Sequence, residues 1–235
     1  LFDNYYEPPM FGEFRPWWWQ LETAKFLSQN KYSFVTSTPR TGKTLSTLMA
    51  IDHLQNNEGQ RAALIIAPLT VAKGGEWENT IREWLPNKRV VVIHEDRENE
   101  LKKPADFYLI NPDGVKIVRE QLEERVRNGY ITIGVVDELT EYANTRSQRW
   151  KAAGAVLSGC NYRWGLTGTP GGPEKIYGQV KLINPDKVPR SFTQWRYQTM
   201  VKITPFKWIP AYGHEEIIKE AMSPVIRYDK GDLMT

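Results

Sequence analysis

Short hydrophobic runs alternate along this chain with stretches whose apolar positions recur at helical spacing. Short apolar runs between polar residues are typical of buried strands, and the helical spacing is typical of amphipathic helices. The runs that predict strands are 32–35, 62–67, 89–93, 107–110, 131–136 and 160–166, and the helical pattern occupies 16–29, 45–51, 71–84 and 115–128. Because strands and helices alternate, the pattern predicts an α/β fold with a doubly wound, mainly parallel sheet and helices on both faces.

Four segments stand outside this alternation. Residues 1–14 are aromatic and irregular, and we interpret them as an N-terminal arm preceding a single domain over 15–235. The charged segment 95–103 predicts a solvated loop, and 111–114 predicts a turn that ends the preceding strand. The last part of the chain predicts only a helix, a Pro-rich connection and a closing helix at about 215–222.

The composition is that of one large globular domain, with 40% hydrophobic and 25% charged residues among 235. No apolar run approaches the roughly 18–20 residues of a membrane span. The sequence predicts no signal peptide, and a single cysteine excludes an internal disulfide framework. We therefore expect a cytoplasmic, nucleoid or nuclear protein that is not secreted and has no membrane partner. The net charge of +3 permits nucleic-acid binding through a local patch but does not require it.

The strongest chemical signal follows the first predicted strand. Residues 37–44 read Ser-Thr-Pro-Arg-Thr-Gly-Lys-Thr and lead directly into a helical pattern. Strand, loop, Gly-Lys-Thr and helix form the context of a phosphate-binding loop, because backbone N–H groups and the helix dipole attract an anion. In this interpretation Lys43 neutralises the β- and γ-phosphates, Thr44 ligates Mg²⁺ and Gly42 lets the backbone approach closely.

This interpretation has simpler alternatives. The first glycine of the usual pattern is Ser37 here, and a chance Gly-Lys-Thr could cap an ordinary helix. Gln20 lies one short helix and one strand upstream, and its amide offers adenine both a donor and an acceptor. A solvated glutamine is the plainer interpretation of Gln20. The residues that we assign to ATP are Gln20, Thr38, Pro39, Arg40, Thr41, Gly42, Lys43 and Thr44.

Two carboxylates follow the apolar run 131–136. Asp137 and Glu138 come at the end of that predicted strand, where α/β sheets bind their ligands. Asp137 can hold Mg²⁺ through water, and Glu138 can orient and polarise the water that attacks the γ-phosphate. The alternative is an acidic cap on the next segment.

Small hydroxyl residues follow the last predicted strand. Thr167, Gly168 and Thr169 precede Pro170, and at this position they can bridge the acidic pair and a nucleic-acid surface. Taken alone, the tetrapeptide would be a plain turn.

Taken in order, these motifs resemble motifs Q, I, II and III of the first RecA-like lobe of superfamily-two helicases. Further stretches resemble the Swi/Snf-type double-stranded DNA translocases. The first is Ala67-Pro68-Leu69, followed by Trp77 and by Glu83-Trp84-Leu85-Pro86. The others are Arg163-Trp164-Gly165 directly before Leu166, the segment that contains Asn144, Arg146, Ser147 and Arg149, and the tail 224–230. The resemblance spans roughly residues 15–235. Motif II departs from the family pattern, because Leu139-Thr140 stands where Ala-His is usual.

The resemblance implies the ATP-binding lobe of a DNA-dependent ATPase that couples hydrolysis to movement on duplex DNA. ATP and Mg²⁺ are the implied cofactors, and the implied partners are double-stranded DNA, bound independently of sequence, and a second RecA-like lobe. Glu138, Lys43 and Asp137 would be catalytic, with Thr167, Gly168 and Thr169 as coupling residues. The implied nucleic-acid contacts are Pro68, Leu69, Thr70, Lys73 and Asn111, although Lys73 is equally explained as a solvated lysine.

Other functions remain open. A motor subunit of a restriction enzyme or an RNA helicase would carry the same motifs, and the sequence does not separate DNA from RNA. A nucleotide kinase has no use for Thr-Gly-Thr-Pro downstream of Asp-Glu, and the intact Lys43, Thr44, Asp137 and Glu138 argue against a non-catalytic docking module.

We expect residues 1–235 alone to bind ATP–Mg²⁺ and to hydrolyse it barely, without unwinding a duplex. In the resembled motors the second lobe supplies an arginine to the γ-phosphate, which is worth about 10³–10⁵ in rate, and no stretch here matches that lobe. Steady-state ATPase assays with and without duplex DNA measure this. DNA-stimulated turnover on the order of 1 s⁻¹ or more would contradict the expectation.

Overall fold

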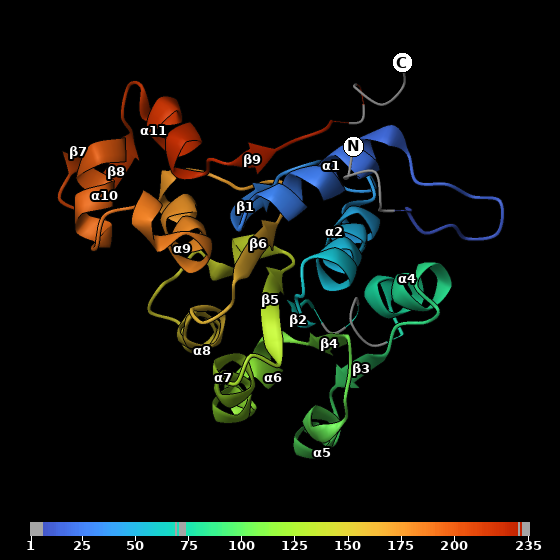
Figure 1. Ribbon diagram of the computed structural model, residues 1–235. Helices are drawn as coiled ribbons and strands as arrows, with labels where there is room; N and C mark the ends of the chain where they lie inside the picture. The colour runs from blue at the N-terminus through green and yellow to red at the C-terminus, as the bar shows by residue number, and fades with distance from the viewer. Residues whose placement is uncertain (1–6, 69, 71–73, 230, 232–235) are drawn as a thin grey trace.

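A parallel sheet forms the centre of the molecule (Figure 1). The computed structural model describes residues 7–68, 70, 74–229 and 231. The sheet has seven strands in the order β3-β4-β2-β5-β6-β1-β9, and all of its pairings are parallel. The strands are β1 (Tyr32–Val35), β2 (Ala62–Ile66), β3 (Val90–Ile93), β4 (Phe107–Ile110), β5 (Ile131–Val136), β6 (Tyr162–Leu166) and β9 (Val225–Ile226).

Helices cover both faces of this sheet, which confirms the predicted doubly wound fold. One face carries α1 (Trp18–Gln29), α2 (Lys43–Asn57) and α4 (Glu76–Trp84). The other carries α6 (Pro112–Ile117), α7 (Arg119–Arg127), the 3-10 turn η1 (Leu139–Tyr142), α8 (Gln148–Leu157) and α9 (Pro173–Ile183).

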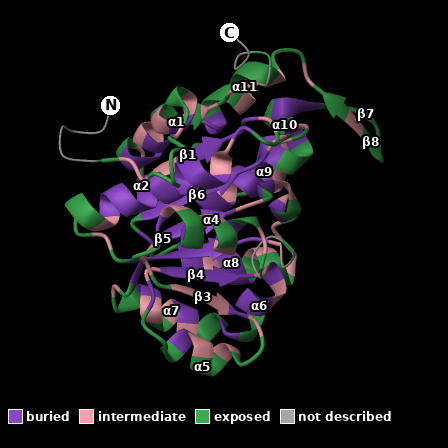
Figure 2. Ribbon diagram, turned by 90° about the vertical axis from the view of Figure 1, so that its right-hand side faces the viewer, coloured by how far each residue is buried: buried purple, intermediate pink, exposed green. Residues whose placement is uncertain are grey.

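Strand β2 shows why the central strands read as unbroken apolar runs. Leu64 and Ile66 belong to the hydrophobic core on one face of the sheet, whereas Ala63 and Ile65 belong to the core on the other. Successive side chains of a strand point to opposite faces, and here both faces are buried (Figure 2). Because the strands are parallel, the carboxyl ends of β1, β2, β4, β5 and β6 lie at one edge.

Two local expectations were wrong. The segment 95–103 is not a loop throughout, because it contains helix α5 (Arg97–Lys102). Leu101 of this helix is buried, and the carboxylate of Glu100 accepts a hydrogen bond of 2.6 Å from the backbone N–H of His94. Nor is 111–114 only a turn, since Asn111 caps α6 and Pro112 occupies its first turn, where a missing N–H costs nothing.

The chain beyond α9 contains more helices and strands than the sequence predicted. Beyond α9 it forms η2 (Pro185–Lys187), α10 (Phe192–Thr199), the antiparallel hairpin β7 (Met200–Thr204) and β8 (Lys207–Pro210), α11 (His214–Ala221) and β9. The hairpin projects from the body of the molecule (Figure 2). Most of its residues are exposed, and Phe206 between its strands is 98% exposed. Residues 201–204 do alternate apolar and polar side chains, but the run is short and is followed by Pro205, a residue typical of turns. The pattern therefore predicted only a Pro-rich connection here.

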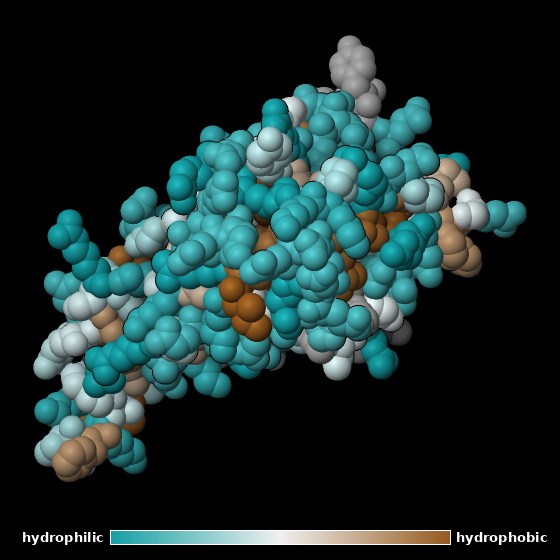
Figure 3. Space-filling view, turned by 90° about the horizontal axis from the view of Figure 1, so that it is seen from below, coloured by the Kyte–Doolittle hydropathy of each residue, from teal (hydrophilic) through white to brown (hydrophobic). Residues whose placement is uncertain are grey.

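The surface at the lower end of the molecule is mostly hydrophilic, and apolar side chains appear there only in small patches (Figure 3). Within the described residues, no helix combines the length and apolar character that a membrane crossing needs.

Replacement of Gly178 by alanine should destabilise the fold by about 1–3 kcal/mol, the usual cost of overpacking. A Cβ at Gly178 in α9 would lie 2.2 Å from the carbonyl oxygen of Ala143 and 2.5 Å from that of Tyr142, and both are backbone atoms that cannot rotate away. The measurement is urea unfolding followed by circular dichroism.

Gly154 in α8 provides the matched control. A Cβ there would find its nearest neighbour at 3.5 Å, an ordinary contact with the Trp150 ring. Gly154→Ala should therefore be neutral or stabilise the helix by up to about 1 kcal/mol. Equal unfolding midpoints for Gly178→Ala and Gly154→Ala would contradict the proposed close packing of α9 on η1.

Candidate nucleotide-binding site

The loop between β1 and α2 has the backbone of a phosphate-binding loop. Arg40 and Gly42 both adopt left-handed conformations, with φ of 66° and 79°. Such conformations turn successive N–H groups toward a common centre and form an anion-binding concavity. Close packing is a second reason for glycine at position 42, since a Cβ there would lie 1.9 Å from Nε2 of Gln20.

Lys43 extends across this loop. Its Nζ donates to the carbonyl oxygens of Ser37 at 2.9 Å and Thr38 at 3.2 Å. Burial lowers the pKa of Lys43, and the negative charges of Asp137 and Glu138 partly offset this effect. The ammonium is thus held over the loop and interacts electrostatically with both carboxylates of the predicted acidic pair.

The acidic pair follows β5 as predicted, and its members have different environments. Asp137 Oδ2 accepts from the Trp77 indole N–H at 2.9 Å, and its Oδ1 accepts from the backbone N–H of Glu138 at 2.9 Å. Burial raises the pKa of Asp137, an effect that these two hydrogen bonds oppose. Glu138 is exposed with φ of 52°, and such a backbone at a residue other than glycine is uncommon and often functional.

Helix α1 places Gln20 against the loop, so this residue is not a solvated glutamine. The Gln20 side chain is buried, and its Oε1 accepts from the backbone N–H of Trp17 at 2.8 Å. The neighbouring Trp19 donates its indole N–H to the carbonyl oxygen of Thr41 at 3.1 Å, which fastens α1 to the loop.

The Thr-Gly-Thr segment after β6 also reaches the loop. A Cβ at Gly168 would lie 3.1 Å from Cδ of Pro39, so these two segments are in contact. Thr167 is buried, its N–H donates to the carbonyl oxygen of Val35 at 2.9 Å, and its Oγ1 accepts from the N–H of Thr169 at 3.3 Å. The structure therefore brings motifs I and III together.

Three of the predicted nucleic-acid residues, Pro68, Thr70 and Asn111, are among the described residues and follow strands at the same edge of the sheet. Pro68 follows β2, Thr70 is exposed, and Asn111 follows β4. The Asn111 side-chain oxygen accepts from the N–H of Gly114 at 3.2 Å, so this residue has a structural role as the cap of α6. Leu69 and Lys73 lie outside the described residues.

Ser37 has a partner that the sequence did not reveal. Its hydroxyl oxygen accepts from the backbone N–H of Tyr228 at 2.9 Å, and the N–H of Thr38 donates to the carbonyl oxygen of Tyr228 at 3.1 Å. The segment after β9 is therefore bound to the phosphate loop. A glycine at this position could not accept this hydrogen bond.

Glu76 is a second residue that sequence reasoning missed. It begins α4, and its Oε1 accepts from the Thr44 hydroxyl at 2.8 Å. No spacing rule links these two positions, which are brought together only by the packing of α4 on α2.

The donor set fits a Mg²⁺ ion that is shared with phosphates. In the part of the chain that the structure describes, no group of three or more His, Cys, Asp or Glu residues could hold a metal ion alone. Mg²⁺ is usually bound through one or two protein oxygens together with substrate phosphates and water. The Thr44 hydroxyl and the Asp137 carboxylate are oxygens of this kind, and both lie in the surroundings of Lys43.

A doubly wound parallel sheet with a Gly-Lys-Thr loop, an acidic pair and Thr-Gly-Thr at one edge defines the class of RecA-like P-loop domains. Within that class, the chain belongs to the SNF2-related domain family, whose sequence model matches residues 34–227, more than half of the chain.

Solved structures share the fold. The SWI2/SNF2 ATPase core of Sulfolobus solfataricus in complex with dsDNA is 23% identical with a TM-score of 0.78, and the match covers 97% of this chain and 47% of that one. The SWI2/SNF2 ATPase core domain of the same organism is 22% identical with a TM-score of 0.73, with coverage of 97% and 50%. This chain thus spans about half the length of those two structures. Among the curated proteins, none matches it.

Ser37→Ala should loosen the tail from the loop. The substitution leaves the Tyr228 N–H without its acceptor, and we expect a loss of about 1 kcal/mol in unfolding free energy with faster hydrogen exchange at the Tyr228 amide. Ser158→Ala is the control, because the Ser158 hydroxyl only donates to the Ala155 carbonyl within its own helix. Exchange at Tyr228 that is the same in both variants would contradict the role of Ser37.

Proposed function

We propose that this chain is the ATP-binding lobe of a DNA-dependent ATPase that couples ATP hydrolysis to movement on duplex DNA. The observation that carries the proposal is the convergence of three motifs at one edge of the sheet. Lys43 of the loop interacts electrostatically with Asp137 and Glu138 of the acidic pair, and Gly168 of the Thr-Gly-Thr segment contacts Pro39 of the loop. Membership of the SNF2-related family supports the same function.

The residues of the loop divide the binding of the nucleotide among them. Lys43 now donates to two neutral carbonyl oxygens and would donate to phosphate oxygens instead when ATP binds. Hydrogen bonds between charged groups are stronger than those between an ammonium and a neutral carbonyl. The left-handed backbone at Arg40 and Gly42 presents N–H groups to the same phosphates. Gln20, which packs against Gly42, would bind the adenine edge with its amide.

The acidic pair divides the chemistry. Asp137 and Thr44 would hold Mg²⁺, which when bound offsets the charge of the phosphates. Asp137 is oriented for this by the Trp77 indole and by the N–H of Glu138. Glu138, whose carboxylate is exposed, would accept the proton of the attacking water.

Nucleic acid would bind along the edge formed by the carboxyl ends of β2 and β4. Pro68, Thr70 and Asn111 stand there, and hydroxyls, backbone N–H groups and helix N-termini bind phosphates without reading bases. We therefore propose sequence-independent, salt-sensitive binding of duplex DNA. A similar fold has been solved with dsDNA. A second RecA-like lobe would complete the motor and supply the arginine, and the site of action would be the cytoplasm, the nucleoid or the nucleus.

The proposal is tested with two substitutions that separate binding from turnover. Lys43→Ala should weaken the affinity for a fluorescent ATP analogue by about tenfold or more, because a charge-assisted contact is worth about 1.5–3 kcal/mol. Glu138→Gln should bind the analogue as tightly as the unaltered chain, yet hydrolyse ATP about 10²–10⁴-fold more slowly in the complete protein.

Lys151→Ala, which removes an exposed lysine from α8, controls for the change in net charge. An affinity for ATP unchanged by Lys43→Ala would overturn the nucleotide site. Stimulation of the complete protein by RNA rather than by duplex DNA would overturn the choice of nucleic acid.

A further inference from the structure

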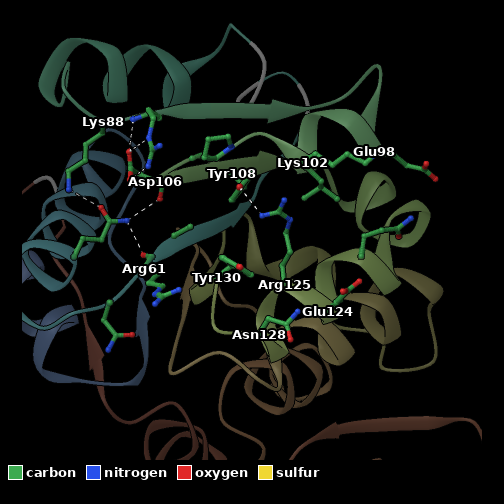
Figure 4. A pocket seen from close by; sticks show the side chains of 18 of the residues that line it. Arg61, Lys88, Glu98, Lys102, Asp106, Tyr108, Glu124, Arg125, Asn128 and Tyr130 are labelled. Carbon is green, nitrogen blue, oxygen red and sulfur yellow. Dashed lines mark hydrogen bonds and ion pairs between the residues drawn. The ribbon is translucent and has the colours of Figure 1, made fainter.

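A second cavity lies at the edge of the sheet opposite the phosphate loop. Its volume is about 900 Å³, and it is lined where β2, β3, β4 and β5 begin and by residues of α2, α5 and α7 (Figure 4). Because the strands are parallel, their starts and ends lie at opposite edges. The motifs of the proposed ATPase site follow the strand ends, so they take no part in this cavity.

Some of the charges that line the cavity are already neutralised. Lys88 forms an ion pair of 2.9 Å with Asp52. Arg89 forms one of 3.2 Å with Asp106, whose carboxylate also accepts from the backbone N–H of Arg89 at 2.8 Å. These residues are parts of the wall and have little charge left for a ligand.

Two other arginines that line the cavity are not neutralised in this way. Arg61 and Arg125 have no carboxylate partner among the described residues. Their guanidinium carbons lie 6.0 Å and 5.9 Å from the centre of the same ring, that of Tyr130. Both positive charges therefore converge on one aromatic side chain at the start of β5.

The position of Arg125 is set before any ligand arrives. Its guanidinium carbon lies 5.5 Å from the centre of the Tyr108 ring, and its Nη1 donates to the Tyr108 hydroxyl at 3.2 Å, the contact drawn in Figure 4. Aromatic faces hold a guanidinium by cation–π attraction and leave most of its N–H groups free. An arginine restrained in this way loses less conformational entropy when it binds an anion.

We propose that this cavity binds a phosphate monoester of a small hydroxylated molecule, such as a nucleoside monophosphate or a sugar phosphate. The N–H groups of Arg61 and Arg125 match phosphate oxygens. The volume lies in the range of about 300–1,000 Å³ that small-molecule sites occupy. Glu98 and Glu124 also line the cavity, and carboxylates can accept hydrogen bonds from the hydroxyl groups of such a ligand. Their negative charge disfavours a polyanion such as a nucleic-acid backbone, which would bring many more phosphates to the site.

The test is a titration of the ¹⁵N-labelled chain, followed through its backbone amide shifts. The probes are adenosine 5′-monophosphate, ribose 5-phosphate and inorganic phosphate. We expect saturable shifts at residues 61–62 and 125–130 with at least one of the two organic phosphates. That ligand should bind about tenfold more tightly than inorganic phosphate, because its hydroxyl groups can add hydrogen bonds to those that the arginines make with the phosphate. Comparison of the two esters shows whether the nucleoside or the sugar phosphate is the better ligand.

The double variant Arg61→Gln, Arg125→Gln should bind about tenfold more weakly or worse. Arg127→Gln is the matched control, since Arg127 is exposed on the same helix and does not line the cavity. It should bind the probes as the unaltered chain does. ATP binding at Lys43 should be unchanged in all variants.

Three results would overturn the proposal. One is the absence of saturable shifts at these amides in the unaltered chain, or shifts confined to residues 38–44. Another is organic phosphates that bind no better than inorganic phosphate. The third is a folded double variant that binds as tightly as Arg127→Gln. The mapping on the unaltered chain decides the question even if the double variant does not fold.

Discussion

The backbone of the loop between β1 and α2 is the constraint on which the rest of the site depends. A left-handed backbone at a residue other than glycine, such as Arg40, is unfavourable unless surrounding structure holds it, whereas Gly42 adopts one freely; here neighbours on several sides hold the loop. Helix α1 holds the loop through Trp19 and Gln20, the segment after β9 through Tyr228, and the segment after β6 through Gly168. The parallel sheet makes this possible, because it delivers β1, β6 and β9 side by side with their ends at the same edge.

The charge states of Lys43 and Asp137, at the edge where the strands end, depend on how the helices pack on the sheet. Burial opposes the charged forms of both Lys43 and Asp137, since it lowers the pKa of the first and raises that of the second. Each is stabilised by the other and by hydrogen bonds from the walls, above all the Trp77 indole on Asp137. Trp77 is itself fully buried in the core between α4 and the sheet. The electrostatics of the site and the hydrophobic core on one face of the sheet are therefore parts of one arrangement.

The fold and the main motifs were predictable because their signals are local. The strands are apolar runs with both faces buried, and the loop and the acidic pair come directly after such runs. Signals failed where a residue depends on a distant partner or has no buried face. The hairpin of β7 and β8 is exposed, and α5 is a single short helix in a charged segment. The unusual Leu139 after the acidic pair is also explained only in space: it is fully buried, and Gly165 on β6 leaves room for it, since a Cβ there would lie 2.5 Å from Leu139 Cδ2.

The sequence by itself determined the alternation of the main strands and helices, the loop with Lys43 and Thr44, and the position of Asp137 and Glu138 after a buried strand, because each rests on residues adjacent in the chain. Only the tertiary structure decided which distant groups complete them. Glu76 meets Thr44 across 32 positions, Tyr228 meets Ser37 across 191, and Arg61 and Arg125 meet at Tyr130 on the far edge of the sheet. The local pattern of apolar and polar residues indicates whether a stretch forms a strand or a helix. Contacts between distant residues depend on how the helices pack on the sheet, and no short stretch of sequence contains that information.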